Sequence, residues 1–238
     1  MVDKLNKTEI CKKAIKALKI VYPKVQCTLN YSYPYRLLIA ARLAAQCTDK
    51  RVNIITKDLF TKYSSLESFA SANYEELKDI IKPCGFYKIK AKDIICMCKM
   101  LKEKYKSSVP QDIDELTKLP GVGRKTANLI LGDIYKKPSI VVDTHCSRVT
   151  RRLGLHGSKS PIIIENILKE IVPPYESTDF CHRLVEHGRN ICRSLKPKCN
   201  VCCMDTFCTK NLIYEPESRK KAVLKADRFI NNTLRTSR

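Results

Sequence analysis

The sequence Leu-Pro-Gly-Val-Gly-Arg-Lys-Thr-Ala-Asn, residues 119–128, is typical of a tight turn between two short helices. Its proline and two glycines interrupt regular helix. Asp112 or Asp114 can cap the helix that precedes the turn. The helix that follows begins near Arg124, and its apolar residues recur at the spacing of one buried face. Those residues are Ala127, Ile130, Leu131 and Ile134.

The first turn of this second helix carries a lysine in a position suited to chemistry. Lys125 lies nearly opposite the apolar stripe, at a helix end whose dipole disfavours cations. That field favours the neutral amine, which a nucleophilic lysine needs. The backbone N–H groups of Gly121, Val122 and Gly123, with Arg124 at the helix start, can hold a phosphate. Taken alone, the turn fits an ordinary helical hairpin with a solvated lysine equally well.

A second motif follows closely, Val-Asp-Thr-His at residues 142–145. Together with residues 119–128 it resembles the helix–hairpin–helix DNA glycosylase superfamily, specifically its endonuclease III branch, and the similarity extends over residues 5–210. In that family the lysine after the hairpin attacks the sugar and the downstream aspartate assists. The resemblance therefore implies that Lys125 and Asp143 are catalytic.

The activity implied is that of a bifunctional DNA glycosylase and AP lyase of base excision repair. Such an enzyme removes oxidised pyrimidines from duplex DNA and cleaves the strand 3′ to the abasic site by β-elimination through a lysine Schiff base. Two alternatives stay open. One is a monofunctional glycosylase for mismatched thymine, uracil or adenine. The other is a non-catalytic helix–hairpin–helix module that only binds DNA.

The resemblance also implies residues that enter the DNA. The segment Leu-Ala-Ala-Gln-Cys-Thr-Asp, residues 43–49, matches a family segment whose glutamine enters the duplex beside the flipped nucleotide, and this is Gln46 here. Gly-Phe-Tyr, residues 85–87, stands where the family has a bulky apolar wedge, so Phe86 is the predicted wedge. Packing of Phe86 beneath its own loop is an equally good interpretation.

The helix after Asp143 supplies the other predicted DNA contacts, Thr144, His145 and Arg148. Arg148 is followed at helical spacing by Arg151 and Arg152, which predicts a basic patch on one helix. A solvated helix face explains the same arginines equally well.

The composition indicates a polyanionic partner. The chain has 238 residues, 44% of them hydrophobic, with 45 Lys and Arg against 24 Asp and Glu, a formal charge of +21. Nucleic acid or an anionic membrane surface fits that excess. No apolar run approaches the roughly 20 residues of a membrane span, and the N-terminus lacks a signal-peptide core. We therefore expect an intracellular monomer that acts with the DNA, in a nucleus or a nucleoid.

Thirteen cysteines are present, and five of them crowd into residues 192–208. The other eight stand mostly alone in helical patterns and are expected to be structural. Four thiolates at the spacing C-x6-C-x2-C-x5-C can converge on one metal centre, either an iron–sulfur cluster or zinc. The resemblance favours a [4Fe–4S] cluster on Cys192, Cys199, Cys202 and Cys208. Cys203 is a fifth thiol able to replace Cys202.

The fold class predicted is all-α, because no alternating β pattern of useful length occurs. The resemblance implies two helical domains with the active site in the cleft between them. One is a six-helix barrel-like domain of residues 27–140 that contains the helix–hairpin–helix at about 112–134. The other is discontinuous, residues 1–26 with 141–210, and carries the cluster loop. Residues 211–238 form a basic C-terminal extension in which Ala222, Leu224, Ala226 and Ile230 are spaced for a short helix.

Overall fold

The computed structural model describes residues 2–210, with side chains from residue 6 onward, and within that range it contains helices and no strands. The all-α prediction is confirmed. The predicted helix of the C-terminal extension lies outside the described residues. The helices are α1 (Val2–Val21), α2 (Pro34–Ala44), α3 (Asp49–Lys62), α4 (Leu66–Ala70), α5 (Tyr74–Ile80), α6 (Tyr87–Tyr105), α7 (Ile113–Lys118), α8 (Arg124–Asp133), α9 (Thr144–Arg152), α10 (Pro161–Ile171) and α11 (Ser177–Asn190), with short 3-10 turns η1 (Lys82–Cys84), η2 (Pro174–Glu176) and η3 (Cys199–Val201).

The chain divides into two compact units. One is continuous and runs from Cys27 to Lys137. The other joins the N-terminal segment, up to Gln26, to the chain from Pro138 onward. Each unit has its own hydrophobic core, so each is described by itself.

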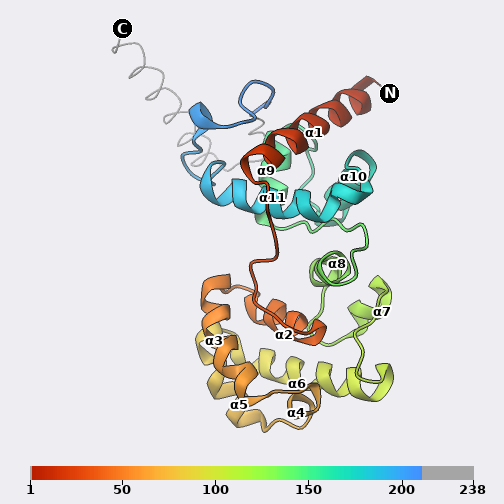
Figure 1. The fold of residues 1–238 in the computed structure, drawn as a ribbon, viewed down its shortest axis with the longest axis vertical. Helices are drawn as coiled ribbons and strands as arrows, with labels where there is room; N and C mark the ends of the chain where they lie inside the picture. The colour runs from red at the N-terminus through yellow and green to blue at the C-terminus, as the bar shows by residue number, and fades with distance from the viewer. Residues whose placement is uncertain (1, 211–238) are drawn as a thin grey trace. The chain divides into compact units, whose positions relative to one another are not determined.

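Helix α2 is the centre of the continuous unit, where it contacts α3, α6 and α8 (Figure 1). Pro34 stands in its first turn, where a missing N–H costs nothing. A helix surrounded by other helices buries side chains all round, and α2 does so with Leu37, Leu38, Ile39, Ala40 and Leu43.

Residues 66–84 fold as α4, α5 and η1 and not as one continuous helix. Two caps explain the break. The Ser65 hydroxyl accepts from the Ser68 N–H, and the Asn73 side chain accepts from the Glu76 N–H, so each begins a new helix. Asn73 thereby interrupts a pattern whose apolar spacing alone looks continuous.

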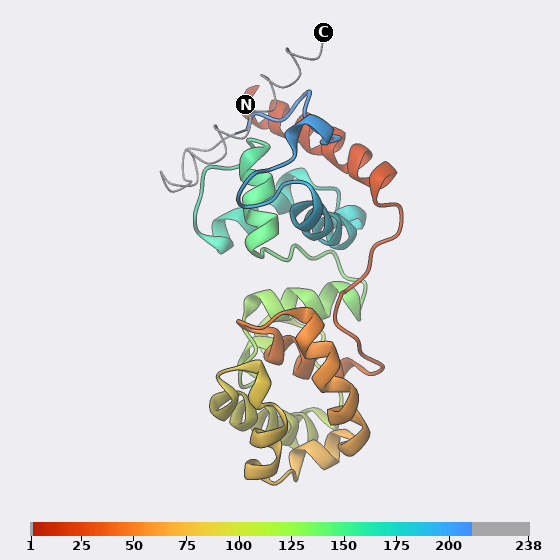
Figure 2. The ribbon, with the colours of Figure 1, turned by 90° about the vertical axis from the view of Figure 1, so that its left-hand side faces the viewer.

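The discontinuous unit is built from α1, α9, α10 and α11 (Figure 2). Helix α11 contacts both α9 and α1, and α1 also contacts α10. Leu18 of α1 and Phe180 of α11 are fully buried in the shared core. Asp143 and the cysteine-rich segment belong to this unit, whereas the glycine hairpin and Lys125 belong to the continuous one.

A buried histidine makes the stability of the discontinuous unit depend on pH. His156 is 3% exposed, and its Nε2 lies 2.9 Å from Thr150 Oγ1. That hydroxyl donates to the Cys146 carbonyl, so its oxygen accepts from His156 Nε2–H. Burial, with a smaller effect from the Arg151 charge, lowers the pKa of His156 from 6.5 to about 4. Between those values the unfolded chain binds more protons than the folded one.

The free energy of unfolding is therefore expected to fall as pH drops below 6.5, by about 2 kcal/mol from this histidine between pH 7 and pH 5. His156→Gln keeps an N–H donor for Thr150 but cannot titrate. Urea unfolding at pH 7 and pH 5 should show that the free energy of unfolding falls less in the variant than in the parent. Equal losses in both proteins would contradict the assignment to His156.

Candidate active site and DNA interface

The glycine hairpin is formed by local capping. Asp112, rather than Asp114, caps α7: its Oδ1 accepts from the N–H groups of Asp114 and Glu115 at 2.8 and 3.1 Å. Val122 is buried and Gly123 is the N-cap of α8. Because Gly123 has no side chain, no side-chain cap covers the first N–H groups of α8. The start of α8 therefore presents backbone N–H groups, whereas the Val122 N–H donates to the Leu119 carbonyl at 3.1 Å.

Gly121 is required both by the backbone and by its neighbours. Its φ of +75° is in the left-handed region, which disfavours residues with a Cβ. A Cβ there would stand 2.7 Å from Arg42 Cδ and 2.9 Å from Asp93 Oδ2. Arg42 of α2 and Asp93 of α6 form an ion pair, with 2.7 Å between Nε and Oδ2. The hairpin thus rests on a charged pair from two other helices.

Lys125 lies in the first turn of α8 with an exposed side chain. The opposite face of this helix is buried, through Ala127 and Ile130 among others. Arg124 is exposed as well. The lysine is thus available to a ligand that approaches the hairpin, while its helix is anchored in the core of the continuous unit.

Asp143 is the N-cap of α9. Its Oδ1 accepts from the Cys146 N–H at 2.7 Å, which is the usual bond of an aspartate cap. This bond fixes the carboxylate at the start of the helix and leaves Oδ2 outside the cap. Thr144, the next residue, is exposed. The capping role was not foreseen from the sequence, although Asp before a helical pattern is a recognised signal for it.

His145 and Arg148 are held against α11. Arg148 Nε donates to the Cys192 carbonyl at 3.1 Å and Nη2 to the Gly188 carbonyl at 3.0 Å. His145 Nδ1 lies 3.2 Å from the same Nη2, and a Cβ at position 188 would stand only 2.7 Å from that ring nitrogen. Burial lowers the pKa of His145, while Asp143 opposes the shift. Both residues therefore connect α9 to the segment that begins the cysteine cluster.

The predicted basic patch on α9 is wrong for Arg152. This residue is 3% exposed, and its Nη1 and Nη2 donate to the carbonyls of Arg193 and Ser194 at 2.8 and 3.1 Å. Its partners follow it by some forty residues in the chain, so helical spacing alone does not reveal them. Arg152 supports the cysteine-rich loop from inside instead of facing solvent.

Gln46 and Phe86 occupy two strained turns of the continuous unit. Gln46 follows the end of α2 with φ +57°, and Phe86 precedes α6 with φ +48°. Both side chains are exposed, Phe86 by 64%. For Phe86 this decides between the two interpretations of the sequence, because the ring does not pack beneath its own loop. Non-glycine residues with such φ values often mark functional positions.

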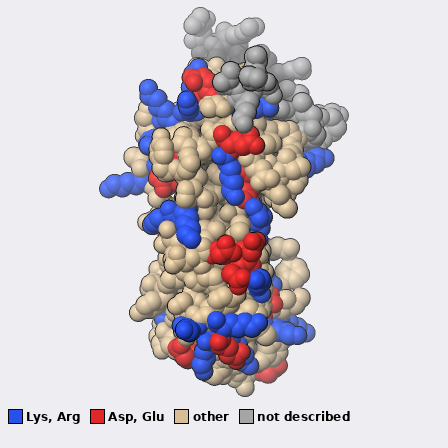
Figure 3. Space-filling model, turned by 90° about the vertical axis from the view of Figure 1, so that its right-hand side faces the viewer, with Lys and Arg blue, Asp and Glu red and all other residues tan. Residues whose placement is uncertain are grey.

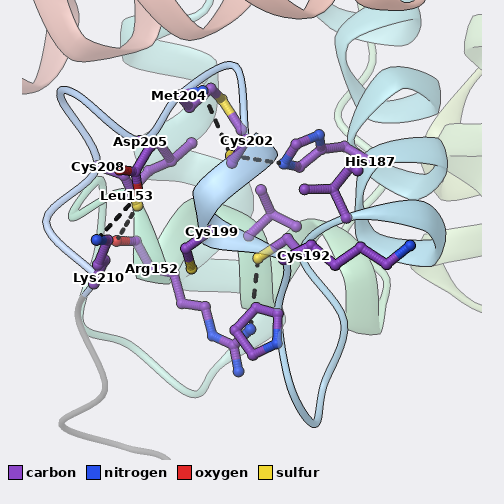
Figure 4. Close-up of a pocket in the computed structure, with 14 residues that line it drawn as sticks. Arg152, Leu153, His187, Cys192, Cys199, Cys202, Met204, Asp205, Cys208 and Lys210 are labelled. Carbon is purple, nitrogen blue, oxygen red and sulfur yellow. Dashed lines mark hydrogen bonds and ion pairs between the residues drawn. The ribbon is translucent and has the colours of Figure 1, made fainter. Parts of the chain in front are cut away.

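The four cysteines of the predicted cluster line one cavity, together with Arg152, His187 and Met204 (Figure 4). Cys203 is not part of that lining. Three nitrogens approach the sulfurs. Arg152 Nη1 donates to Cys192 Sγ at 3.5 Å, Cys202 Sγ accepts from the Met204 N–H at 3.4 Å, and His187 Nε2 lies 3.5 Å from the same sulfur. Such donors are typical around iron–sulfur thiolates.

Within the described residues, no three Cys, His, Asp or Glu side chains are arranged to hold a single metal ion. An iron–sulfur cluster is larger than one ion, so its four ligands surround a wider space than the ligands of a tetrahedral zinc. Four cysteines around a common cavity, with N–H donors beside them, fit the larger group. The four thiolates, taken without the cavity, fit either an iron–sulfur cluster or zinc.

Known proteins resemble this chain in both sequence and structure. Residues 39–174 match the HhH-GPD superfamily of base excision DNA repair proteins. Endonuclease III of Rickettsia felis is 44% identical over 186 residues, which is 78% of this chain and 87% of the relative. The protein belongs to the HhH-GPD superfamily. Two solved structures match with a TM-score of 0.82 and 38% identity, over 86% of this chain and 96% of theirs. One is a non-covalent endonuclease III–DNA complex and the other a trapped endonuclease III–DNA covalent intermediate.

Family membership confirms the resemblance on which the sequence interpretation relied. The similarity spans both units, so the chain is more than an isolated helix–hairpin–helix module. It is a DNA glycosylase and AP lyase of base excision repair, whose partner is damaged duplex DNA.

None of the described helices is long and apolar enough to cross a membrane. Lys and Arg side chains are spread over the face shown in Figure 3, with Asp and Glu among them.

Proposed function

We propose that Lys125 is the nucleophile of this glycosylase and lyase. The observation that carries the proposal is an exposed lysine in the first turn of α8, directly after a backbone hairpin suited to a phosphate. The neutral amine attacks C1′ of the damaged nucleotide, and the C1′–N bond breaks as the base leaves. The C1′–O4′ bond then opens, O4′ takes up a proton, and C1′ forms a Schiff base with the lysine nitrogen. This Schiff base loses a proton from C2′, and the C3′–O bond breaks with the 3′ phosphate as the leaving group. A solved relative that is a covalent DNA intermediate supports a protein nucleophile.

Asp143 is proposed to be the second catalytic residue. Its Oδ1 is occupied by the helix cap, which holds the carboxylate in one orientation. Its other oxygen accepts the proton that Lys125 must lose, or stabilises the positive charge that develops on the sugar. The remaining predicted contacts serve DNA binding: the hairpin residues Gly121, Val122, Gly123 and Arg124 toward a phosphate, and Thr144, His145 and Arg148 at the start of α9.

Gln46 and Phe86 are proposed to enter the duplex where the damaged nucleotide has left it. Exposed side chains on short, strained turns can fill the space of an extruded base, and this offsets the few kcal/mol lost in unstacking. The substrates proposed are oxidised pyrimidines and abasic sites in duplex DNA. The protein accordingly acts where the cell keeps its DNA, in a nucleus or a nucleoid.

A [4Fe–4S] cluster is proposed to be held by Cys192, Cys199, Cys202 and Cys208. When bound, it links the ends of a loop that buries little apolar surface of its own and so gives that loop a fixed shape. Arg148 and Arg152 already fasten the start of this loop through its carbonyls. The loop's own basic residues, Lys196 and Lys198, then present a fixed surface to phosphates.

The cysteine assignment predicts different behaviour for neighbouring thiols. Cys202→Ser is expected to lose cluster absorbance in the visible region and most of its iron, whereas Cys203→Ser should keep both, because only Cys202 lines the cavity. The measurements are the absorbance spectrum and the iron and zinc content of the anaerobically purified protein. Stoichiometric zinc without iron would contradict the cluster. Equal loss in both variants would contradict the choice of Cys202.

Borohydride trapping tests the proposed reaction. A duplex that carries thymine glycol and a duplex that carries an abasic site are incubated with enzyme and sodium borohydride. Covalent adducts on both are expected, because borohydride reduces the Schiff base to a stable amine. An adduct on the abasic duplex alone would retain the lyase but contradict the proposed base specificity. Release of free base without any adduct would indicate a monofunctional enzyme.

A further inference from the structure

Lys90 of α6 is one of the largest fully buried side chains of the protein, with an exposure of 1%. Its ammonium group donates three hydrogen bonds, to the carbonyls of Leu43 at 2.9 Å, Ala45 at 2.7 Å and Cys84 at 2.9 Å. A protonated lysine has three N–H donors and no acceptor, so this cage satisfies it completely. Burial of a charged group is costly unless it is hydrogen-bonded, and these three carbonyls supply that compensation.

The three carbonyls come from two segments that are far apart in the sequence. Leu43 and Ala45 are at the end of α2, where helix carbonyls lack partners and a cation is favoured. Cys84 ends η1. Nothing in the helical pattern of α6 reveals this role, because a lysine in such a pattern is normally solvated. The ammonium therefore joins the two segments at one point.

Each of these segments leads directly into a strained turn. The Ala45 carbonyl belongs to the peptide bond of Gln46, whose φ is +57°. The Cys84 carbonyl belongs to the peptide bond of Gly85, φ +68°, which is followed by Phe86 at φ +48°. Left-handed conformations of non-glycine residues persist only where the surroundings enforce them. The Lys90 ammonium binds a peptide group at the start of each turn.

We propose that Lys90 is a positioning residue that sets the spacing between Gln46 and Phe86, so that both enter the duplex together. The inference rests on the proposed insertion of these two side chains. Lys90 thereby controls base extrusion, although it contacts neither DNA nor the reacting atoms. Loss of the ammonium releases three carbonyls and removes the bonds that hold both turns to α6, although the Cys47 and Cys84 thiols still interact. Lys125 and its hairpin keep their own supports.

The test compares single-turnover base release from a thymine glycol duplex with cleavage of an abasic single strand, which requires no extrusion. Lys90→Met is expected to lose on the order of 100-fold in base release, as small misplacements of positioning groups do. Cleavage of the single strand should change by only a few fold. Lys90→Gln keeps N–H donors, so its rate of base release is expected to lie between those of Lys90→Met and the parent. Lys99→Met, an exposed lysine on the same helix, is the matched control.

Two further measurements separate positioning from general damage to the fold. Fluorescence of 2-aminopurine placed opposite the lesion reports unstacking, and it should rise less with Lys90→Met than with the parent. Gln46→Ala should lower the rate of base release less in the Lys90→Met background than in the parent, because the glutamine is already misplaced there. Equal losses on duplex and single strand, with unchanged fluorescence, would overturn the inference.

The single variants distinguish the positioning role of Lys90 from the insertion roles of Gln46 and Phe86 on which it rests. If Gln46→Ala and Phe86→Ala both lose base release while Lys90→Met and Lys90→Gln do not, the insertion roles stand and Lys90 is no positioning residue. If neither alanine variant changes base release, the insertion roles fail, and the inference fails with them. Borohydride adducts with the parent protein would still support Lys125 and the lyase in that case.

Discussion

Lys125→Met is expected to lose strand cleavage and borohydride adducts by at least about 10³-fold while it still binds DNA. Methionine has a similar length but no amine, so no Schiff base can form. The side chain is exposed in the first turn of α8, where a substitution normally changes stability by no more than about 0.5 kcal/mol. Loss of activity in a folded protein therefore reports chemistry.

The measurement combines trapping on an abasic duplex with a binding assay and a thermal unfolding curve. Lys118→Met is the matched control, because it removes an exposed lysine from α7, just before the hairpin. It should nick and form adducts as the parent does. Adduct formation by Lys125→Met at the parent rate would place the nucleophile elsewhere. Loss of DNA binding in Lys125→Met would point to a role in phosphate recognition instead.

Asp143→Asn is expected to slow base release by about 10²- to 10⁴-fold with almost no change in stability. The reason lies in the two functions of this side chain. Asparagine caps a helix about as well as aspartate does, so the bond to the Cys146 N–H is retained. The negative charge and the proton acceptor are lost. Asparagine thus removes the proposed chemistry and keeps the local structure.

Asp143→Ala supplies the complementary case, since it removes the cap as well and should cost about 1 kcal/mol of stability. Thermal unfolding and single-turnover base release are measured for both variants. Asp143→Asn as active as the parent would show that capping is the whole role of this residue. Equal destabilisation in the two variants would contradict the assignment of the cap to the Oδ1 bond.

The hairpin and its flanking helices could be predicted because their determinants are local. Proline, two glycines and a capping aspartate lie within a dozen residues, and each acts on its own neighbours. The predicted positions of Lys125 in the first turn and of the apolar face behind it agree with the structure. The break between α4 and α5 is also local, because the Asn73 side chain caps α5 by accepting from the Glu76 N–H.

The supports of the site could not be predicted, because their partners are distant in the sequence. Arg42 has no role in the sequence pattern, yet it pairs with Asp93, 51 residues away, beneath Gly121. Lys90 and Arg152 look like solvated residues of amphipathic helices, and both are buried on backbone carbonyls. A cation bound to carbonyls leaves no complementary charge to find in the sequence.

The discontinuous unit has a consequence for the order in which the protein matures on the ribosome. Helix α1 is synthesised before the continuous unit, but its packing partners α10 and α11 emerge only after that whole unit. The Cys27–Lys137 unit can therefore fold during translation, while the apolar face of α1, including Leu18, waits without a core. Nascent chains that stop before α11 should bind general chaperones through this N-terminal segment, and release should follow once α11 has left the exit tunnel.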